Sequence, residues 1–245
     1  MLALPDSSRT PPDNTEEDPD EKTADAARHL VVKTLRRGYT IENLIQISKN
    51  AISLAGGILA AVRQVKGPPR PKACSAECSY CCHLLVEVSV PEVVSLVSFI
   101  NENFTATDLE ALKIRVQKTE QRIRGMNSYE RLFAREPCPL LRNGKCSVYA
   151  ARPLVCRGYN SYNWVTCAQD LKYSRSWRLI PHDEAEKDIY SDVLDGLVTG
   201  LKEEGLPSEP LELIAALQIA LNHPDAGNRW LAGDSIFEPT IAPEE

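Results

Sequence analysis

The feature that most constrains this chain is a run of cysteines, Cys74-Ser-Ala-Glu-Cys78-Ser-Tyr-Cys81-Cys82. The run holds four of the eight cysteines of the 245-residue sequence within nine residues. The other four follow in the middle of the chain, at Cys138, Cys146, Cys156 and Cys167. Both long flanks lack cysteine. A dense group of thiols framed by ordinary sequence indicates a metal site built into a fold.

The spacing of the run suits metal binding. In a C-x3-C-x2-C loop, two or three sulfurs turn towards one ion and a second segment completes the shell, here through Cys138, Cys146 and Cys156. Because Cys81 and Cys82 are adjacent, their side chains diverge, so that one faces the metal while the other packs or binds a second ion. Two alternatives remain: buried cysteines acting as small hydrophobic residues, which suits Cys167, and disulfides.

Composition places the chain among soluble proteins of the reducing cytoplasm, where metals compete for thiols. The sequence is 43% hydrophobic, enough for a real core, and it shows no secretory signal. Its longest apolar stretch, 41–62, is interrupted by polar and charged residues, so no membrane segment is expected. Most of the net charge of −6 lies in residues 1–22, and no basic field suggests nucleic acid as a partner.

The pattern of apolar residues predicts a mainly α fold, a helical domain with a small β-hairpin beside a cysteine-rich metal site. Asn143-Gly144 between short apolar runs predicts the hairpin, and Leu84–Val90 has strand-like content. Thr40, Ser89 and Thr107 are expected to start helices. The predicted helices span 23–37, 40–63, 89–103, 107–124, 183–203 and 210–221.

The expected organisation has five parts. Acidic residues 1–22 are predicted to be disordered, because they cannot offset their ordering entropy. A helical hairpin, in which Gly56-Gly57 marks a kink or a close helix crossing, precedes the cysteine domain, and helices and a tail follow it. The parts are 1–22, 23–66, 67–180, 181–223 and 224–245.

The cysteine motifs resemble those of the YkgJ-type CxxCxxCC cysteine-cluster family. The match rests on the run at 74–82, on Cys138-Pro-Leu-Leu, on Asn143-Gly-Lys-Cys146-Ser-Val-Tyr149 and on Arg152-Pro-Leu-Val-Cys156-Arg157. The family's domain is a zinc- or iron-chelating one, similar to the cysteine region of flagellin lysine N-methylase. The resemblance implies metal chelation by seven cysteines, Cys74, Cys78, Cys81, Cys82, Cys138, Cys146 and Cys156. It leaves Cys167 without a role.

Three functions are consistent with this sequence. The first is thiolate binding of zinc or iron, the latter also as a [4Fe–4S] cluster, with a structural or sensing role. The second, implied by the resemblance, is S-adenosylmethionine-dependent lysine N-methylation with an iron–sulfur cluster, although no Gly-rich nucleotide loop follows a strand. The third is thiol redox chemistry at Cys81-Cys82. Arg152 and Arg157 are expected to offset thiolate charge, and the flanking helices are a candidate surface for a protein partner.

Overall fold

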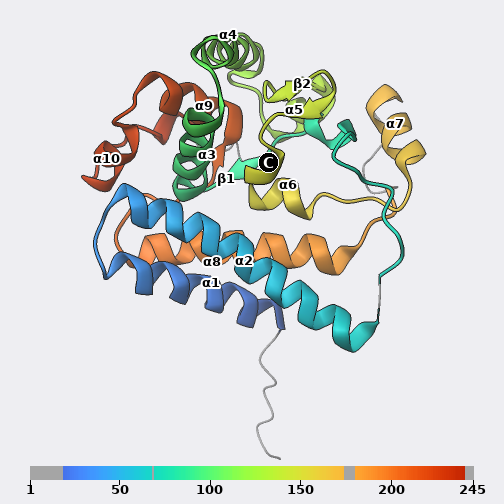
Figure 1. Cartoon of the computed structure of the whole chain (residues 1–245), viewed down its shortest axis with the longest axis horizontal. Helices are drawn as coiled ribbons and strands as arrows, with labels where there is room; N and C mark the ends of the chain where they lie inside the picture. The colour runs from blue at the N-terminus through green and yellow to red at the C-terminus, as the bar shows by residue number, and fades with distance from the viewer. Residues whose placement is uncertain (1–18, 68, 174–179, 241–245) are drawn as a thin grey trace, which may run out of the picture.

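The computed structural model describes residues 19–67, 69–173 and 180–240. In this part of the chain ten α-helices account for most of the structure, and the strands form two antiparallel pairs of two residues each (Figure 1). The predicted fold class, mainly α with a small hairpin beside the cysteines, is confirmed. Residues 1–18 of the expected acidic tail lie outside the described residues, and so does Pro68 of the connector before the cysteines.

Three long helices form a layer along one side of the molecule (Figure 1). They are α1 (Pro19–Leu35), α2 (Ile41–Lys66) and α8 (Glu184–Glu203), and each contacts the other two. α1 begins at Pro19, so residues 19–22 belong to a helix and the prediction that they extend the disordered tail was wrong. The predicted cap of α2 is confirmed, since the Thr40 hydroxyl accepts a hydrogen bond from the Asn43 N–H at 3.2 Å.

Glycines allow α1 and α8 to pack closely. A Cβ atom on Gly196 of α8 would lie 2.1 Å from the Ala24 carbonyl oxygen, and one on Gly200 would lie 2.7 Å from Val31 Cβ. The close crossing expected at Gly56-Gly57 of α2 was wrong, because nothing lies within 4 Å of a Cβ placed at either residue. The sequence shows that glycines lie in a helix, but the partner of each depends on the tertiary fold.

Replacing Gly196 by alanine is therefore expected to destabilise the protein by about 3 kcal/mol, because overpacking a closely packed contact forces the two backbones apart. Urea unfolding followed by circular dichroism measures the change. Gly57→Ala is the matched control, since it adds the same methyl group at an open helical position and should stabilise by about 1 kcal/mol. Equal stabilities of the two variants would contradict the close packing of α1 on α8.

The middle of the chain builds helices from local capping signals. Ser89 and Glu92 form the predicted capping box at the start of α3 (Val90–Asn103). α4 (Ala106–Ile123) is capped by Thr105 rather than by the expected Thr107, because the Thr105 hydroxyl accepts the Asp108 N–H at 3.1 Å. A short α5 (Ser128–Ala134) follows, which was not predicted.

The hairpin joins β2 (Leu141–Arg142) to β3 (Lys145–Cys146), as predicted. Its turn residues have positive φ, 52° at Asn143 and 76° at Gly144, which is the conformation that this residue pair favours. The chain then forms one short 3₁₀ helix and two α-helices. These are η2 (Tyr149–Ala151), α6 (Leu154–Gly158) and α7 (Trp164–Tyr173).

The C-terminal part closes the core. β4 (Leu211–Glu212) pairs with β1 (Glu87–Val88) and leads into α9 (Leu213–Asn222). The expectation of a tail from residue 224 was wrong for 226–240, where α10 (Ala226–Leu231) and η4 (Glu238–Thr240) bury two large side chains, Trp230 and Phe237. Both side chains lie in short apolar stretches within a polar, glycine-containing sequence, so periodicity did not reveal them. Residues 241–245 lie outside the described part.

Among the described residues, α2 is the one helix long and apolar enough, by length and composition alone, to cross a membrane. One side of this helix belongs to the hydrophobic core. Its buried residues are Leu44, Ile47, Ser48, Ala51, Ala55 and Leu59.

Candidate metal centre

Six of the eight cysteines line one cavity, although they come from segments more than fifty positions apart in the sequence. The cavity has a volume of about 60 Å³, and its remaining walls are mostly apolar, with Arg152 and Glu212 as the charged residues. The cysteines that line it are Cys78, Cys81, Cys82, Cys138, Cys146 and Cys156. The structure therefore brings together six of the seven cysteines that the resemblance implies as ligands.

Backbone hydrogen bonds hold the two cysteine segments together. Cys81 and Cys82 lie on a short 3₁₀ helix, η1 (Tyr80–His83). The Cys138 N–H donates to the Cys82 carbonyl at 2.8 Å, and so fixes the start of the hairpin segment against this turn. In the hairpin, Cys146 pairs with Leu141, three residues after Cys138. Cys138 and Cys146 thus meet at the open end of the hairpin, as its turn predicted.

Cys156 is positioned by a buried carboxylate. Glu92 accepts the Leu154 N–H at 2.8 Å at the start of α6, the helix that carries Cys156. The same side chain accepts the Ser89 N–H at 2.8 Å and the Ser89 hydroxyl at 2.9 Å. Burial raises the pKa of Glu92. The capping residue of α3 therefore also caps α6, a second role that the local motif does not reveal.

Glu92→Ala is expected to cost about 3 kcal/mol, because it leaves buried N–H groups without a partner. It should also raise the reactivity of the Cys156 thiol by loosening the start of α6. Alkylation of the metal-free protein followed by mass spectrometry measures that reactivity, and Glu92→Gln, which keeps an acceptor oxygen, serves as the control. An unchanged rate at Cys156 in the alanine variant would show that Glu92 does not position it.

Burial determines the protonation of the cavity thiols. It raises the pKa of Cys138 to about 12 and that of Cys156 well above its ordinary value. The pKa of Cys81 is also raised well above the ordinary value, chiefly by its hydrogen bond with Cys82 and then by burial. Without a cation these three thiols are neutral at pH 7, so metal binding must replace their protons.

Arg152 is the cation of the cavity. Its guanidinium carbon lies 3.8 Å from the centre of the Tyr149 ring, and its charge opposes the rise in pKa at Cys81, Cys146 and Cys156. Its buried Nε atom has no hydrogen-bond partner within the described residues. Arg157 has a different role, because it donates to the carbonyls of Arg152 at 2.8 Å and Ala150 at 2.6 Å. Arg152 thus faces the thiols, while Arg157 holds the loop.

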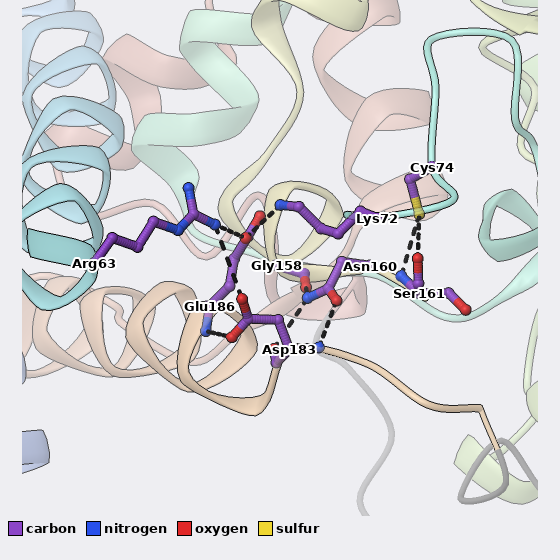
Figure 2. Close-up of polar contacts among 8 residues, drawn as sticks. All are labelled: Arg63, Lys72, Cys74, Gly158, Asn160, Ser161, Asp183 and Glu186. Atoms are coloured by element: carbon purple, nitrogen blue, oxygen red, sulfur yellow. Dashed lines mark hydrogen bonds and ion pairs between the residues drawn. The ribbon is translucent and has the colours of Figure 1, made fainter. Parts of the chain in front are cut away.

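Cys74, the seventh cysteine that the resemblance implies, does not line this cavity. The Ser161 N–H donates to its sulfur at 3.2 Å, and the thiol faces the Ser161 carbonyl at 3.8 Å (Figure 2). Ala73 continues this pairing, because its N–H donates to the same carbonyl at 2.8 Å. Cys74 therefore lies against the segment that follows α6, beside the cavity.

A polar network fixes the segment that leads into Cys74 to the start of α8 (Figure 2). Arg63 of α2 donates to Glu186 at 2.5 Å, and Lys72 pairs with the same carboxylate. Asn160 is bonded to Asp183 in both directions, accepting its N–H at 2.7 Å and donating to its carbonyl at 3.1 Å. The network ties α2, the cysteine loop and α8 together at one point.

Sequence reasoning missed an ion pair at the cavity wall whose two residues are far apart in the sequence. Glu212 lines the cavity and pairs at 3.3 Å with Arg131, whose side chain is 1% exposed. Two further nitrogens of Arg131 are buried without a partner in the described part of the chain. Glu212 and Arg131 are 81 positions apart, and no local motif surrounds either of them, so no signal in the sequence could have joined them.

The donor set suits a thiophilic metal, but the sulfurs do not yet converge on it. All eight cysteines are free thiols, and thiolates are the ligands that zinc and iron–sulfur clusters favour. As the side chains stand, no group of three or more His, Cys, Asp and Glu residues in the described chain is placed to hold a metal ion. Rotation of Cys side chains about χ1 moves their sulfurs without moving the backbone. The residues fit a metal by chemistry and location, and binding requires such rotation.

Residues 73–177 match the family model CxxCxxCC, described as a "putative zinc- or iron-chelating domain". The match spans the cysteine run, the hairpin and α7, and it agrees with the family that the cysteine motifs resemble. Comparison with curated proteins returned no match, and neither did comparison with solved structures.

Proposed function

From the match of residues 73–177 to the CxxCxxCC model of zinc- or iron-chelating domains, we propose that this protein binds zinc or iron through cysteine thiolates in the cavity. The observation that carries the proposal is that six cysteines from two distant segments line one small cavity. An ion there links η1, the hairpin and α6. We propose that the ligands of the bound metal, whether one ion, several ions or a cluster, come from seven cysteines, of which Cys74 lies outside the cavity lining: Cys74, Cys78, Cys81, Cys82, Cys138, Cys146 and Cys156.

The charges around the cavity support this role. Thiolates in an apolar cavity need compensating positive charge, which a divalent metal supplies together with Arg152. When bound, the metal supplies a strong link between parts of the chain that otherwise meet through a few backbone bonds. The protein's own residues orient the ligands: Glu92 positions α6 and the hairpin positions Cys146. We propose that the metal has a structural or sensing role in a reducing cytoplasm.

The size of the cavity favours an ion over an organic cofactor. At about 60 Å³ it is far smaller than the roughly 300–1,000 Å³ of pockets that hold small molecules. S-adenosylmethionine, which the lysine N-methylase alternative requires, would need a different site. Calorimetry with S-adenosylmethionine on metal-loaded protein tests that alternative, and tight binding would revive it.

The proposal is tested by titrating reduced, metal-free protein with Zn²⁺ or, without oxygen, with Fe²⁺, in competition with a chromophoric chelator. We expect stoichiometric binding and protection of the cavity cysteines against alkylation. Cys167 is monitored separately, because it lies outside the proposed ligand set. Absence of binding to either metal, or alkylation of Cys138 and Cys156 at the same rate with and without metal, would overturn the proposal.

A further inference from the structure

A groove with basic side chains lies between the end of α1 and the facing part of α2. Its volume is about 330 Å³. Five of the residues that line it come from α1 or the turn after it, and the sixth, Asn50, comes from α2. The residues that line this basic groove are His29, Leu30, Lys33, Thr34, Arg37 and Asn50. None of them lines the metal cavity, so the basic groove is a separate feature of the helical layer.

The basic residues of the groove follow one another along one face of α1. His29, Lys33 and Arg37 are spaced by four residues, which corresponds to about 6 Å between neighbours along a helix. Lys33, Arg36 and Arg37 are exposed, and none of these three forms an ion pair with a described residue. Their positive charge is therefore not neutralised by the part of the chain that the structure describes.

Two acidic residues beside this stretch of α1 already have partners. Asp25 pairs with Arg28 at 2.7 Å and contacts His29 at 3.0 Å. Glu203 of α8 pairs with Arg28 at 2.5 Å. The charge of α1 is thus divided along its length, with acids in its first turn and unpaired cations at its end. An acidic partner is therefore attracted to the end of the helix and not to its start.

The chain carries an acidic segment attached to the start of α1. Residues 1–18, which lie outside the described part of the chain, hold five acids and one base, Arg9. Four of these acids fall in the last six residues of the segment, at Asp13, Glu16, Glu17 and Asp18. The segment joins the described structure at Pro19, the first residue of α1. One chain thus contains an acidic segment and an unneutralised basic groove.

The acidic segment is long enough to reach the basic groove. Lys33 lies 14 residues after Pro19, a distance of about 21 Å along α1. Asp6 lies 13 residues before Pro19, a stretch that spans up to about 45 Å when extended. The acids of the segment can therefore reach as far as the end of the helix, where the unpaired cations lie.

We propose that the acidic segment 1–18 binds in the basic groove of its own chain, with its carboxylates paired to Lys33 and Arg37. The opposite charges of segment and groove, and the length of chain between them, carry the proposal. Because both partners belong to one molecule, their effective concentration is on the order of mM, so that several weak surface ion pairs suffice. The contact involves no cysteine, so it is independent of the proposed metal site.

Carbodiimide cross-linking of the full-length protein tests the contact, because it joins a lysine amine to a carboxylate only where the two meet. Mass spectrometry should find Lys33 joined to acids of residues 1–18. The yield should fall at about 1 M salt, where the Debye length is only about 3 Å. Lys118 is the control, an exposed lysine of α4, which lies on the opposite side of the molecule from α1 (Figure 1). Equal yields at Lys33 and Lys118 would overturn the proposal.

A mixture of isotope-labelled and unlabelled protein distinguishes contacts within one chain from contacts between two copies. The proposal predicts that the Lys33 products contain either two labelled or two unlabelled partners. Products that join a labelled to an unlabelled chain in the proportion of a random mixture would show that the groove binds a second copy, and would overturn the proposal.

Charge reversal gives a second measurement. A glutamate-specific protease cuts the native protein at Glu16 and Glu17, and the cutting rate reports how often the segment is unbound. Arg37→Asp should raise this rate about threefold or more, since a bound site is cleaved only while it is free. Lys118→Asp, which makes the same charge change on α4, should leave it unchanged. Far-UV circular dichroism checks that both variants fold, and equal rates in both variants and the wild type would overturn the proposal.

Discussion

Replacing Cys156 by serine is expected to weaken metal binding in the cavity by at least about 10²-fold. A hydroxyl is a poor substitute for a thiolate, and loss of a residue that merely supports a ligand already costs roughly 10–100-fold. Cys156 lies on α6, which is held at its start by Glu92, so the chain cannot readily present another sulfur there. Competition titration of reduced protein with Zn²⁺ measures the change.

Two controls separate the loss of a ligand from a general loss of structure. Cys156→Ala removes the sulfur without burying a hydroxyl, which alone can cost about 1–3 kcal/mol. It should show the same loss of affinity with less loss of stability. Cys138→Ser tests a second cavity cysteine from a different element. Affinities within threefold of the wild type in the Cys156 variants would remove Cys156 from the ligand set.

Removing the metal is expected to lower the midpoint of thermal unfolding by about 10–20 °C. Thiolate sites do not form in unfolded chains, so binding free energy appears as folding free energy. A loss on the order of 5 kcal/mol corresponds to this shift, since 1 kcal/mol changes the midpoint by roughly 2–4 °C in a chain of this size. Thermal scans with and without a chelator, in the presence of reductant, measure it.

The destabilisation should be local. The layer of α1, α2 and α8 is held by buried apolar residues and close helix contacts, and none of its residues lines the cavity. Hydrogen exchange after chelation is therefore expected to rise in 74–82 and 138–158 and to stay low in that layer. The Cys156→Ala variant provides the control, because a chelator should affect it much less. Identical unfolding midpoints and exchange rates with and without metal would show that the metal does not support the fold.

Local signals in the sequence were sufficient to predict several helix starts, the hairpin and the two cysteines at its open end. Thr40 and Ser89 cap the helices expected from them, because a capping hydrogen bond involves residues three positions apart. Asn143-Gly144 determines its turn in the same way, because both residues accept positive φ. The cysteine run and the hairpin together predicted that Cys138 and Cys146 meet, and this prediction is confirmed by the pairing of β2 with β3 and by the cavity that both cysteines line.

The features of the fold and of the cavity that the sequence did not predict depend on contacts between distant parts of the chain. The capping residue Glu92 also holds α6, 62 positions away, and Glu212 reaches the cavity from the pairing of β4 with β1. The segment around Cys167 reads as a polar loop, and it is a helix because Asn163 caps it and Asp170 binds Arg135. Each of these contacts is determined by how the elements pack, and no periodicity or motif spacing in a single sequence predicts which residues will meet.

Metal analysis and an absorption spectrum of protein purified without oxygen test metal binding by these cysteines. We expect zinc or iron bound in a ratio of at least one per chain, released when the thiols are alkylated under denaturing conditions. Zinc in a colourless protein would identify single thiolate-bound ions, whereas iron with inorganic sulfide and a broad visible band would identify a cluster. A folded, reduced protein that contains neither metal and takes up neither would show that these cysteines do not form a metal site.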